Sequence, residues 1–564
     1  MRKRNRFLCL FKNNIISQKG MALIATLIFV FVLTTLGIAL LTMTRNEIKL
    51  SVLQEQSTKA FYLADAGVEK ALNWLEMFST PPTKENLDAT DFDGNIEFDE
   101  LSAGKYTVKL YIDDELGELV ARYVIETEGL VTRPDNSRVS RKIKTLVRVS
   151  NFAEYAYFSD DERFPNNTNI AGSGYTGSKI WFTGNDVLGG KIHSNSQFHM
   201  VDVPHFLDKL TSTADTIDFW GDAYDENGSD FPGFAGANPP DTPGDYELGV
   251  DIIPLPQYRS ISDLDDEYSL QRIAGGSWEK TDIVGLSNGV YVPSAGGMGT
   301  EATGGIYIKG NATSINLDVE NADDPNSTNS KITFVQGVNT TTITSVLSPI
   351  TLSAESTLNT ITVPAGTTIP ANTTLIKTAA NTYISYVGIT NGLLFVDGSI
   401  NSLHGGNHKG KMTIAANLSI NITGDLLYES RNDPALKDLD INEFNEEDMA
   451  SIVDTLGLIS AKDVVIDNNA GHDVEVDAIT MAINTSFFYE GWQNYMRGTL
   501  NLLGGLIQKE RGPVGTHHAG TKVTGYSKNY HYDIRMANPA GGYLPPYFPT
   551  TGNYEKVYWK EVLN

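Results

Sequence analysis

The longest apolar stretch of the chain lies near its N-terminus. Residues 20–44 (GMALIATLIFVFVLTTLGIALLTMT) contain no charged side chain. A helix of that length measures about 37 Å, which is enough to cross the hydrocarbon core of a bilayer. The pattern predicts a transmembrane helix from Met21 to Thr44. Residues 1–20 carry six basic and no acidic side chains, so the positive-inside rule predicts a cytoplasmic N-terminus and a body outside the cytoplasm.

An amphipathic pattern continues directly from this apolar stretch. Apolar side chains recur there at intervals of three and four residues, as on one buried face of a helix, at Ala64, Val68, Ala71, Leu72 and Leu75. Pro81 and Pro82 then stop the pattern. We therefore expect one helix over residues 21–78. Its first half is apolar on all sides, and its second half packs on a globular domain.

Period-two alternation replaces the helical pattern in residues 79–150. Tyr106, Val108, Leu110 and Ile112 alternate with more polar side chains, which predicts a small antiparallel sheet. A long helix followed by a sheet of few strands forms the first predicted domain.

Short apolar runs broken by Gly, Asn and Asp fill residues 151–337 and 383–564. They predict a large all-β body, in which the density of Gly and Asn favours a β-solenoid or β-helix over a sandwich. The predicted fold class is therefore α+β: a long N-terminal helix, a small antiparallel sheet and a large all-β body. Nine aromatic side chains near the C-terminus predict a cap on the open end of the solenoid: Tyr526, Tyr530, Tyr532, Tyr543, Tyr547, Phe548, Tyr554, Tyr558 and Trp559.

Residues 338–382 differ from their surroundings in composition. Fourteen of them are threonine, and only Glu355 and Lys377 are charged. The segment predicts a Thr-rich β excursion from the body. A stiff polar flap is the favoured role for this excursion, and a binding surface and a site of O-glycosylation are the two alternatives.

Composition excludes several classes of function. The 564 residues are enough for more than one domain, and 43 basic against 69 acidic side chains give a formal net charge of −26. A chain this acidic repels phosphate backbones, so we expect no nucleic-acid partner. Cys9 is the only cysteine, which excludes a disulfide scaffold and a cysteine-ligated zinc site.

Two acidic loops are candidate calcium sites. The first matches several ligand positions of an EF-hand loop, although Ala89 occupies the first position and the next segment predicts a strand. Calcium is therefore the one candidate cofactor, and an acidic turn without metal is the favoured alternative. The candidate ligands are Asp91, Asp93 and Glu100 in the first loop, and Asp225, Asn227 and Asp230 in the second.

No motif of catalysis accompanies these loops. His193, His199 and His205 are six residues apart, and for each a structural or hydrogen-bonding role is favoured over metal binding. The chain lacks a nucleophile elbow, a P-loop, a dinucleotide fingerprint and HExxH. The sequence therefore predicts no catalytic residue and no enzyme.

Three patches in the N-terminal region carry a family resemblance: residues 18–24 (QKGMALI), 33–37 (LTTLG) and 61–69 (FYLADAGVE). Residues 15–75 resemble a prepilin with a class III signal and are most similar to the PilX-like minor pilins of type IV pili. The resemblance implies that residues 1–20 are a leader, that a prepilin peptidase cleaves after Gly20, and that Met21 is then N-methylated. It also implies that residues 79–150 form a pilin-like sheet.

One position departs from the pattern of major pilins. They have glutamate as the fifth residue of the mature chain, and this chain has Ala25 there. That glutamate neutralises the terminal amine of a neighbouring subunit inside the apolar filament core, where an unpaired charge is costly. The resemblance therefore implies a low-copy or tip subunit rather than a repeating one.

Together these features predict a non-catalytic minor subunit of a type IV pilus or related filament, with a role in assembly, adhesion or surface display. A membrane-anchored extracellular adhesin outside any filament is the alternative, and a polysaccharide-active β-helix enzyme is the third interpretation. The expected partners are other pilins or pseudopilins, the prepilin peptidase, membrane lipid, and a glycan or other ligand on a host or substratum. We expect a single-pass cell-membrane protein that reaches the pilus or cell surface.

Overall fold

The computed structural model describes most of the chain and divides it into two compact units. The first, which we call the helix–sheet unit, contains the described residues up to Arg148 and from Tyr554 onward. The second, the body, contains the described residues of Val149–Asn553. The sequence predicted this boundary at residue 150. The described residues are 18–75, 87, 96–101, 104–112, 122–133, 136–165, 177–183, 186–201, 204–206, 208–220, 246–320, 329–436, 439, 441, 444–518, 521–537 and 542–562.

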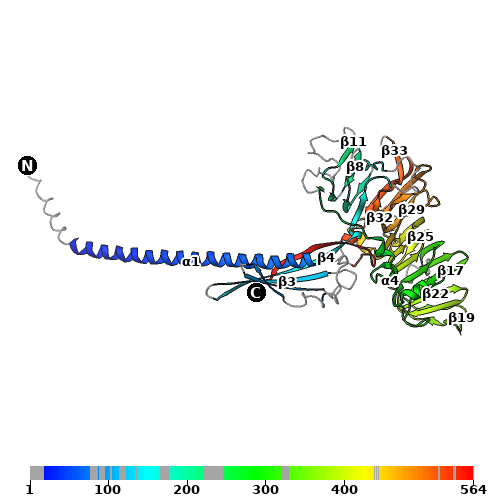
Figure 1. Cartoon of the computed structure of the whole chain (residues 1–564), viewed down its shortest axis with the longest axis horizontal. Helices are drawn as coiled ribbons and strands as arrows, with labels where there is room; N and C mark the ends of the chain where they lie inside the picture. The colour runs from blue at the N-terminus through cyan, green and yellow to red at the C-terminus, as the bar shows by residue number, and fades with distance from the viewer. Residues whose placement is uncertain are drawn as a thin grey trace, which may run out of the picture. The chain divides into compact units, whose positions relative to one another are not determined.

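One long helix, α1 (Gln18–Leu75), opens the helix–sheet unit and is the blue helix of Figure 1. Its large apolar side chains from Leu23 to Met43 are 49–69% exposed. Seven apolar side chains of its second half are buried: Ala60, Leu63, Ala64, Val68, Ala71, Leu72 and Leu75. The two predicted halves of the helix are therefore both present. By length and composition α1 can cross a membrane, as predicted.

A five-stranded antiparallel sheet completes this unit, in the order β1-β2-β3-β4-β35. Strands β2, β3 and β4 pair residue by residue, with Val108 opposite Thr127 and Thr127 opposite Ile143. Apolar side chains alternate along these strands as the sequence predicted, and α1 packs on β2 and β3. The bounds are β1 Ile96–Leu101, β2 Gly104–Ile112, β3 Arg122–Thr132, β4 Arg138–Asn151 and β35 Thr550–Val562.

The last strand corrects the prediction of an aromatic cap. Tyr554, Tyr558 and Trp559 lie in β35, which pairs with β4, and these three residues belong to the helix–sheet unit and not to the body. Cross-strand pairing between residues some 400 positions apart leaves no local signal in the sequence. The other six aromatic residues of the predicted cap do belong to the body: Tyr526, Tyr530 and Tyr532 in β34, and Tyr543, Tyr547 and Phe548 in the segment that follows.

The body is β-rich, as predicted, and its helices are short. Its helical elements are η2 (Phe152–Glu154), α3 (Tyr258–Ile261), α4 (Leu270–Gly275), α5 (Lys280–Val284), η3 (Glu429–Asn432), α6 (Glu446–Ser451) and η5 (Ile534–Ala537). Its strands are β5 (Tyr155–Asp161), β6 (Val187–Leu188), β7 (Lys191–Ser194), β8 (His199–Val201), β9 (His205–Phe206), β10 (Leu210–Ser212), β11 (Asp218–Trp220), β12 (Tyr246–Leu248), β13 (Gly289–Tyr291), β14 (Ile306–Lys309), β15 (Ser314–Val319), β16 (Ser330–Gln336), β17 (Asn339–Val346), β18 (Ile350–Thr351), β19 (Ser356–Leu358), β20 (Ile361–Val363), β21 (Thr368–Ile369), β22 (Thr373–Ala379), β23 (Thr382–Val387), β24 (Leu393–Asp397), β25 (Ile400–His408), β26 (Lys411–Ala416), β27 (Ile420–Tyr428), β28 (Thr455–Ser460), β29 (Val464–Ile466), β30 (Val474–Ala482), β31 (Phe487–Tyr489), β32 (Met496–Glu510), β33 (Gly515–His518) and β34 (Thr521–Tyr532).

Two ladders of parallel strands organise the body. One runs β14-β24-β26-β28-β30-β32 and continues with β5, β7, β10 and β12, so the first strands of the body stack after its later ones. The other runs β15-β25-β27-β29-β31. In β24, Leu394 faces one apolar core and Phe395 faces another, so this strand is covered on both faces. Such burial explains why apolar runs such as LLFV do not alternate.

The Thr-rich segment 338–382 forms antiparallel strands at one end of the body, where Figure 1 shows β17, β19 and β22. Strand β17 pairs with β16 on one side and β22 on the other, and β22 pairs with β23. Two further hairpin pairings, β18 with β21 and β19 with β20, lie between them. A small apolar cluster of its own holds the segment together: Val346, Leu352, Ile369 and Leu375.

The chain enters and leaves the body at one place. The backbone N–H of Phe152 donates to the carbonyl of Pro549 (3.0 Å), and Thr551 Oγ1 donates to the carbonyl of Ser150 (3.2 Å). The Asn151 amide also donates to the carbonyl of Phe548 (2.9 Å). In chain order, the body is therefore one insertion between β4 and β35, two neighbouring strands of the sheet.

Candidate functional site

The predicted processing residues lie at the start of α1. Gly20 and Met21 are within its first turns, and Ala25 is an exposed helical residue. Cleavage after Gly20 and methylation of Met21 remain predictions.

The apolar half of α1 satisfies its own hydroxyl groups. Each of the five threonines between Met21 and Thr44 donates its hydroxyl hydrogen to a carbonyl three or four residues earlier, at 2.7–3.0 Å. A hydroxyl without a partner is costly in lipid or in an apolar filament core, and these bonds remove that cost. The segment is thus suited to an environment without water along its whole predicted transmembrane length.

Close packing explains the third patch of the sequence, FYLADAGVE. A Cβ placed on Gly67 would lie 3.0 Å from Thr127 Cγ2 and 3.1 Å from the Tyr106 ring. A Cβ placed on Gly129 of β3 would lie 2.0 Å from the carbonyl oxygen of Ala60. The backbones of α1 and β3 therefore touch, and only glycine fits at this contact.

The same patch also contacts the last strand. The Phe61 ring lies 5.8 Å from that of Trp559, edge to face, and Glu69 forms an ion pair with Lys556. Residues 61–69 therefore join the N-terminal helix to strands β2 and β3 of the sheet and to β35. Residues 61–69 are thus the surface through which α1 packs on the sheet of its own unit.

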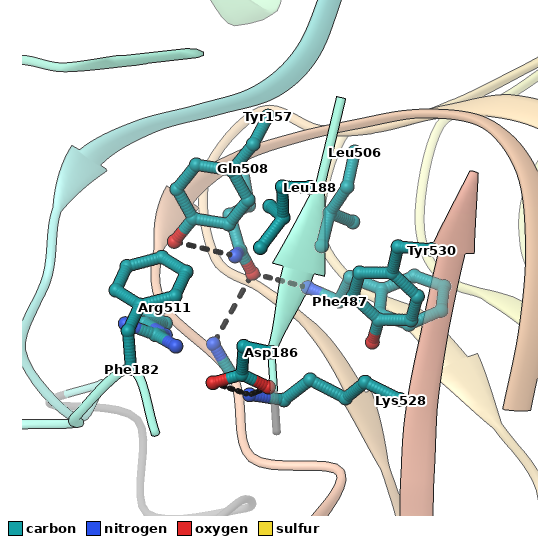
Figure 2. Close-up of a pocket in the computed structure, with 11 residues that line it drawn as sticks. Tyr157, Phe182, Asp186, Leu188, Phe487, Leu506, Gln508, Arg511, Lys528 and Tyr530 are labelled. Atoms are coloured by element: carbon teal, nitrogen blue, oxygen red, sulfur yellow. Dashed lines mark hydrogen bonds and ion pairs between the residues drawn. The ribbon is translucent and has the colours of Figure 1, made fainter. Parts of the chain in front are cut away.

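A polar cluster lies inside the body where β32 and β34 meet β5 and β6 (Figure 2). Arg511 Nη1 lies 2.9 Å from Glu162 Oε2, and its guanidinium stacks 3.6 Å from the centre of the Phe182 ring. Lys528 Nζ lies 3.1 Å from Asp186 Oδ1. We call these two ion pairs the buried pairs.

Burial and charge act in opposite directions in this cluster. Burial lowers the pKa of Lys528, and the carboxylate of Asp186 opposes the change. For Asp186, burial favours the neutral acid, but the charges of Lys528 and Arg511 outweigh it and the pKa is lowered. The positive charges of Lys528 and Arg511 therefore favour the ionised form of Asp186 despite its burial. The cavity beside them measures about 20 Å³, room for about one water, so it is too small for a ligand.

Two open grooves lie on the surface of the body. The threonine groove, of about 1,020 Å³, is lined by the β16–β17 and β22–β23 turns together with Asn288 and Asn311. The histidine groove, of about 640 Å³, includes His404, Asp425 and Asp467.

The acidic groups of the histidine groove are already engaged. Asp425 accepts the backbone N–H of Glu475 at 2.9 Å, and Asp467 accepts that of Asn469 at 2.7 Å. These carboxylates hold turns of the chain. His404 Nδ1 lies 3.3 Å from the hydroxyl oxygen of Ser402.

The calcium prediction is not tested by the structure. Among the candidate ligands, only Glu100 is described, as a residue of β1; Asp91, Asp93, Asp225, Asn227 and Asp230 lie outside the described residues. Within the described part of the chain, no three His, Cys, Asp or Glu side chains come close enough to hold a metal ion.

Two of the three candidate histidines, His193 and His199, form hydrogen bonds, and the side chain of His205 lies outside the described part of the structure. His193 is buried against Phe158 and bonds to Thr211 (2.8 Å), while His199 bonds to Asp218 (2.9 Å). The described side chains thus follow the predicted preference for hydrogen-bonding roles.

Sequence reasoning missed the buried pairs. Glu162 and Arg511 are 349 residues apart, and Asp186 and Lys528 are 342 apart. The only available signal was a charged residue directly after a long apolar strand, as in LNLLGGLIQKER, and that signal does not name the partner.

Two family models match parts of the chain. Residues 19–69 match the model described as PilX N-terminal, which confirms the predicted PilX-like segment and covers most of α1. Residues 118–214 match a domain of unknown function (DUF4900), whose described residues include β3 and most of β4 in the helix–sheet unit and the first strands of the body. No curated protein and no solved structure matches the chain.

Proposed function

We propose, from its PilX-like N-terminal segment, that the chain is a minor subunit of a type IV pilus or a related filament. In this proposal α1 anchors the protein in the cytoplasmic membrane with its N-terminus inside, and after cleavage at Gly20 it packs among the helices of other pilins. The body is displayed outside the cell. No catalytic step is part of the proposal.

The observation that carries this proposal is the contrast between the two halves of α1. The first half leaves its apolar side chains uncovered and satisfies every threonine hydroxyl internally. The second half is tied to a sheet through Gly67 and Gly129. A helix of this kind needs an apolar partner along its first half, which either lipid or neighbouring pilin helices supply.

A tip or low-copy position is the finer part of the proposal. Ala25 offers no carboxylate to a neighbour's terminal amine. The inserted body, Val149–Asn553, has an expected radius of gyration of about 22 Å if compact, which is large for a closely repeated subunit. Both features favour a subunit that is added once or rarely.

We also propose that the body is a β-solenoid. Its support is the parallel register of the ladder, in which Leu394 lies opposite both Ile306 and Ile414 on either side, and Ile414 lies opposite Leu458. A sandwich is built from antiparallel sheets, whereas a solenoid stacks successive turns of chain in parallel.

N-terminal mass spectrometry of the envelope and sheared-filament fractions tests the filament role. We expect a chain that begins at N-methylated Met21 and is present in sheared filaments. A chain that keeps Met1 and stays in the membrane fraction would support the anchored adhesin instead.

Immunogold labelling of the body tests the tip position separately. We expect gold at filament ends. Regular labelling along the shaft would contradict the tip position and leave the filament role intact.

A further inference from the structure

The threonine groove has the size of a ligand site and an unusual lining for this chain. Its volume of about 1,020 Å³ is at the upper end of the range of ligand pockets, about 300–1,000 Å³. The protein has 69 acidic side chains, yet none of those that the structure describes lines the groove. Among the described residues, Lys377 is the only charged one in its lining.

Five polar side chains of the groove have no hydrogen-bond partner among the described residues, whereas Asn311 Oδ1 accepts from the Ser399 backbone N–H (2.8 Å) and Thr342 Oγ1 lies 3.4 Å from Thr333 Oγ1. The side chains of Asn288, Asn339, Thr340, Thr341 and Thr378 form no hydrogen bond with another described residue. Threonine is β-branched, so its side chain has few rotamers to lose on binding. The groove therefore presents rigid, neutral donors and acceptors to solvent.

Gln336 adds a fixed amide at the floor of the groove. Its Nε2 donates to the carbonyls of Lys309 (3.1 Å) and Asn311 (3.0 Å), which holds the side chain in place. Both bonds use the nitrogen, so Oε1 remains as an acceptor. Lys377 is positioned in a similar way, because its ammonium lies 5.7 Å from the centre of the Tyr383 ring.

We propose that the threonine groove binds a neutral polysaccharide. Sugar hydroxyls are both donors and acceptors, and they match a lining of amides and threonine hydroxyls without requiring an opposite charge. An anionic polymer would meet one lysine within a chain of net charge −26. The exposed Val338 at the β16–β17 turn offers an apolar contact for the C–H face of a sugar ring. The proposal rests on the proposed display of the body outside the cell.

The structure also favours this groove over the histidine groove. Both carboxylates named in the histidine groove already accept backbone N–H groups, and that groove is smaller. In the threonine groove the five side chains without a partner among the described residues are free to exchange water for a ligand.

Binding to a defined set of hexasaccharides tests the proposal. The probes are fluorescent hexamers of β-1,3-glucose, β-1,4-glucose, β-1,4-mannose and N-acetylglucosamine, with hexagalacturonate as the anionic comparison, added to the purified full chain in detergent. We expect at least one neutral hexamer to bind with a Kd of about 1 mM or tighter, and hexagalacturonate to bind more weakly. No binding by any neutral hexamer at that level, or tighter binding of hexagalacturonate, overturns the proposal.

Matched substitutions locate the site. Thr340 is exposed and lines the groove, whereas Thr368 is exposed in β21 of the same Thr-rich segment and lies outside the groove. Thr340→Arg fills the groove and should weaken binding about tenfold or more, while Thr368→Arg should leave it unchanged. Equal effects of the two substitutions, or none, overturn the proposal.

Failure of this proposal can be told apart from failure of the proposed function. Hexasaccharide binding is measured on purified protein and does not depend on filaments. Protease treatment of intact cells, followed by detection of the body, reports display. A protein that binds the hexamer but is protected in intact cells would contradict the display, while a displayed protein that binds none would contradict only the groove.

Discussion

The helix–sheet unit and the body satisfy their polar groups over very different distances along the chain. In α1, the threonine hydroxyls bond three or four residues back. In the sheet, Glu126 lies opposite Lys144 on the next strand, and the hydrogen bonds from Lys144 and Tyr111 outweigh burial and lower the pKa of Glu126. In the body, Arg511 and Lys528 find their partners more than 340 residues away.

The two units therefore depend on different interactions for their stability. The first unit depends mostly on local pattern and on glycines that allow close packing. The body depends on joining its first strands to its later ones, at the step from β32 to β5. Substitutions in one unit should therefore change one property of the protein and spare the other.

The largest effect should come from Gly20. We expect Gly20→Phe to block cleavage completely, because the family resemblance places a glycine at the residue before the cut. The product should migrate as a precursor twenty residues longer, while its body stays folded and resists limited proteolysis. Gly37→Ala is the control, since a Cβ at Gly37 meets nothing within 4 Å. Normal mobility of Gly20→Phe would contradict the prepilin prediction.

The buried pairs should give the next largest effect, confined to the body. Arg511→Met leaves the fully buried Glu162 without its cation and should lower the free energy of unfolding of the body by about 3–5 kcal/mol, measured by urea denaturation. Lys280→Met is the matched control, because its ion pair with Asp265 is exposed and is worth about 0–1 kcal/mol.

A second substitution sharpens this test. The double variant Glu162→Gln/Arg511→Met leaves no unpaired charge in the body. Part of the free energy of unfolding that Arg511→Met loses should therefore be recovered. If Arg511→Met alone lowers the free energy of unfolding no more than Lys280→Met does, the buried pairs do not stabilise the contact between the first strands of the body and its later ones.

The contact between α1 and β3 should be sensitive to a single methyl group. In Gly129→Ala the new Cβ would lie 2.0 Å from the carbonyl oxygen of Ala60, so the backbones must separate. We expect the helix–sheet unit to lose about 1–3 kcal/mol, read from amide hydrogen exchange in β3. Exchange in the body strand β28 should not change. Equal loss of protection in both units would mean that they unfold together.

Sequence reasoning succeeded where the interactions are local. The helix, its two halves and the alternating strands of the small sheet follow from periodicity alone, and the PilX-like segment follows from three short patches. The body was predicted as β-rich, because many short apolar runs are broken by Gly and Asn. Its strand order was not predicted, since parallel pairing between β32 and β5 connects residues that no pattern links.

The position of the last strand shows the same limit. Aromatic residues at the C-terminus predicted burial, but not in which unit. Tyr554 packs beside Tyr123 of β3, with ring centres 5.8 Å apart, and Trp559 contacts Phe61. Phe548, only six residues before Tyr554, belongs to the body core. The threonine groove has the same limit. Composition distinguishes the Thr-rich segment from its surroundings, but only the structure shows which of its threonines line a groove.

The smallest effect should be a pH dependence of the body. His408 is buried and its Nε2 lies 3.0 Å from the carbonyl oxygen of Thr455. Burial lowers the pKa of His408 below its ordinary 6.5, although the carboxylate of Asp454 partly opposes this. Above pH 6.5 the imidazole is neutral in both folded and unfolded chains. As the pH falls below 6.5 the unfolded chain takes up the proton first, so stability is lost on the acid side.

His408→Gln should therefore lose less stability than the native chain between pH 7.5 and pH 5.5 in urea denaturation, while His472→Gln, at an exposed position, should behave as the native chain. An equal loss in His408→Gln and the native chain would show that other groups, and not His408, set the acid sensitivity of the body.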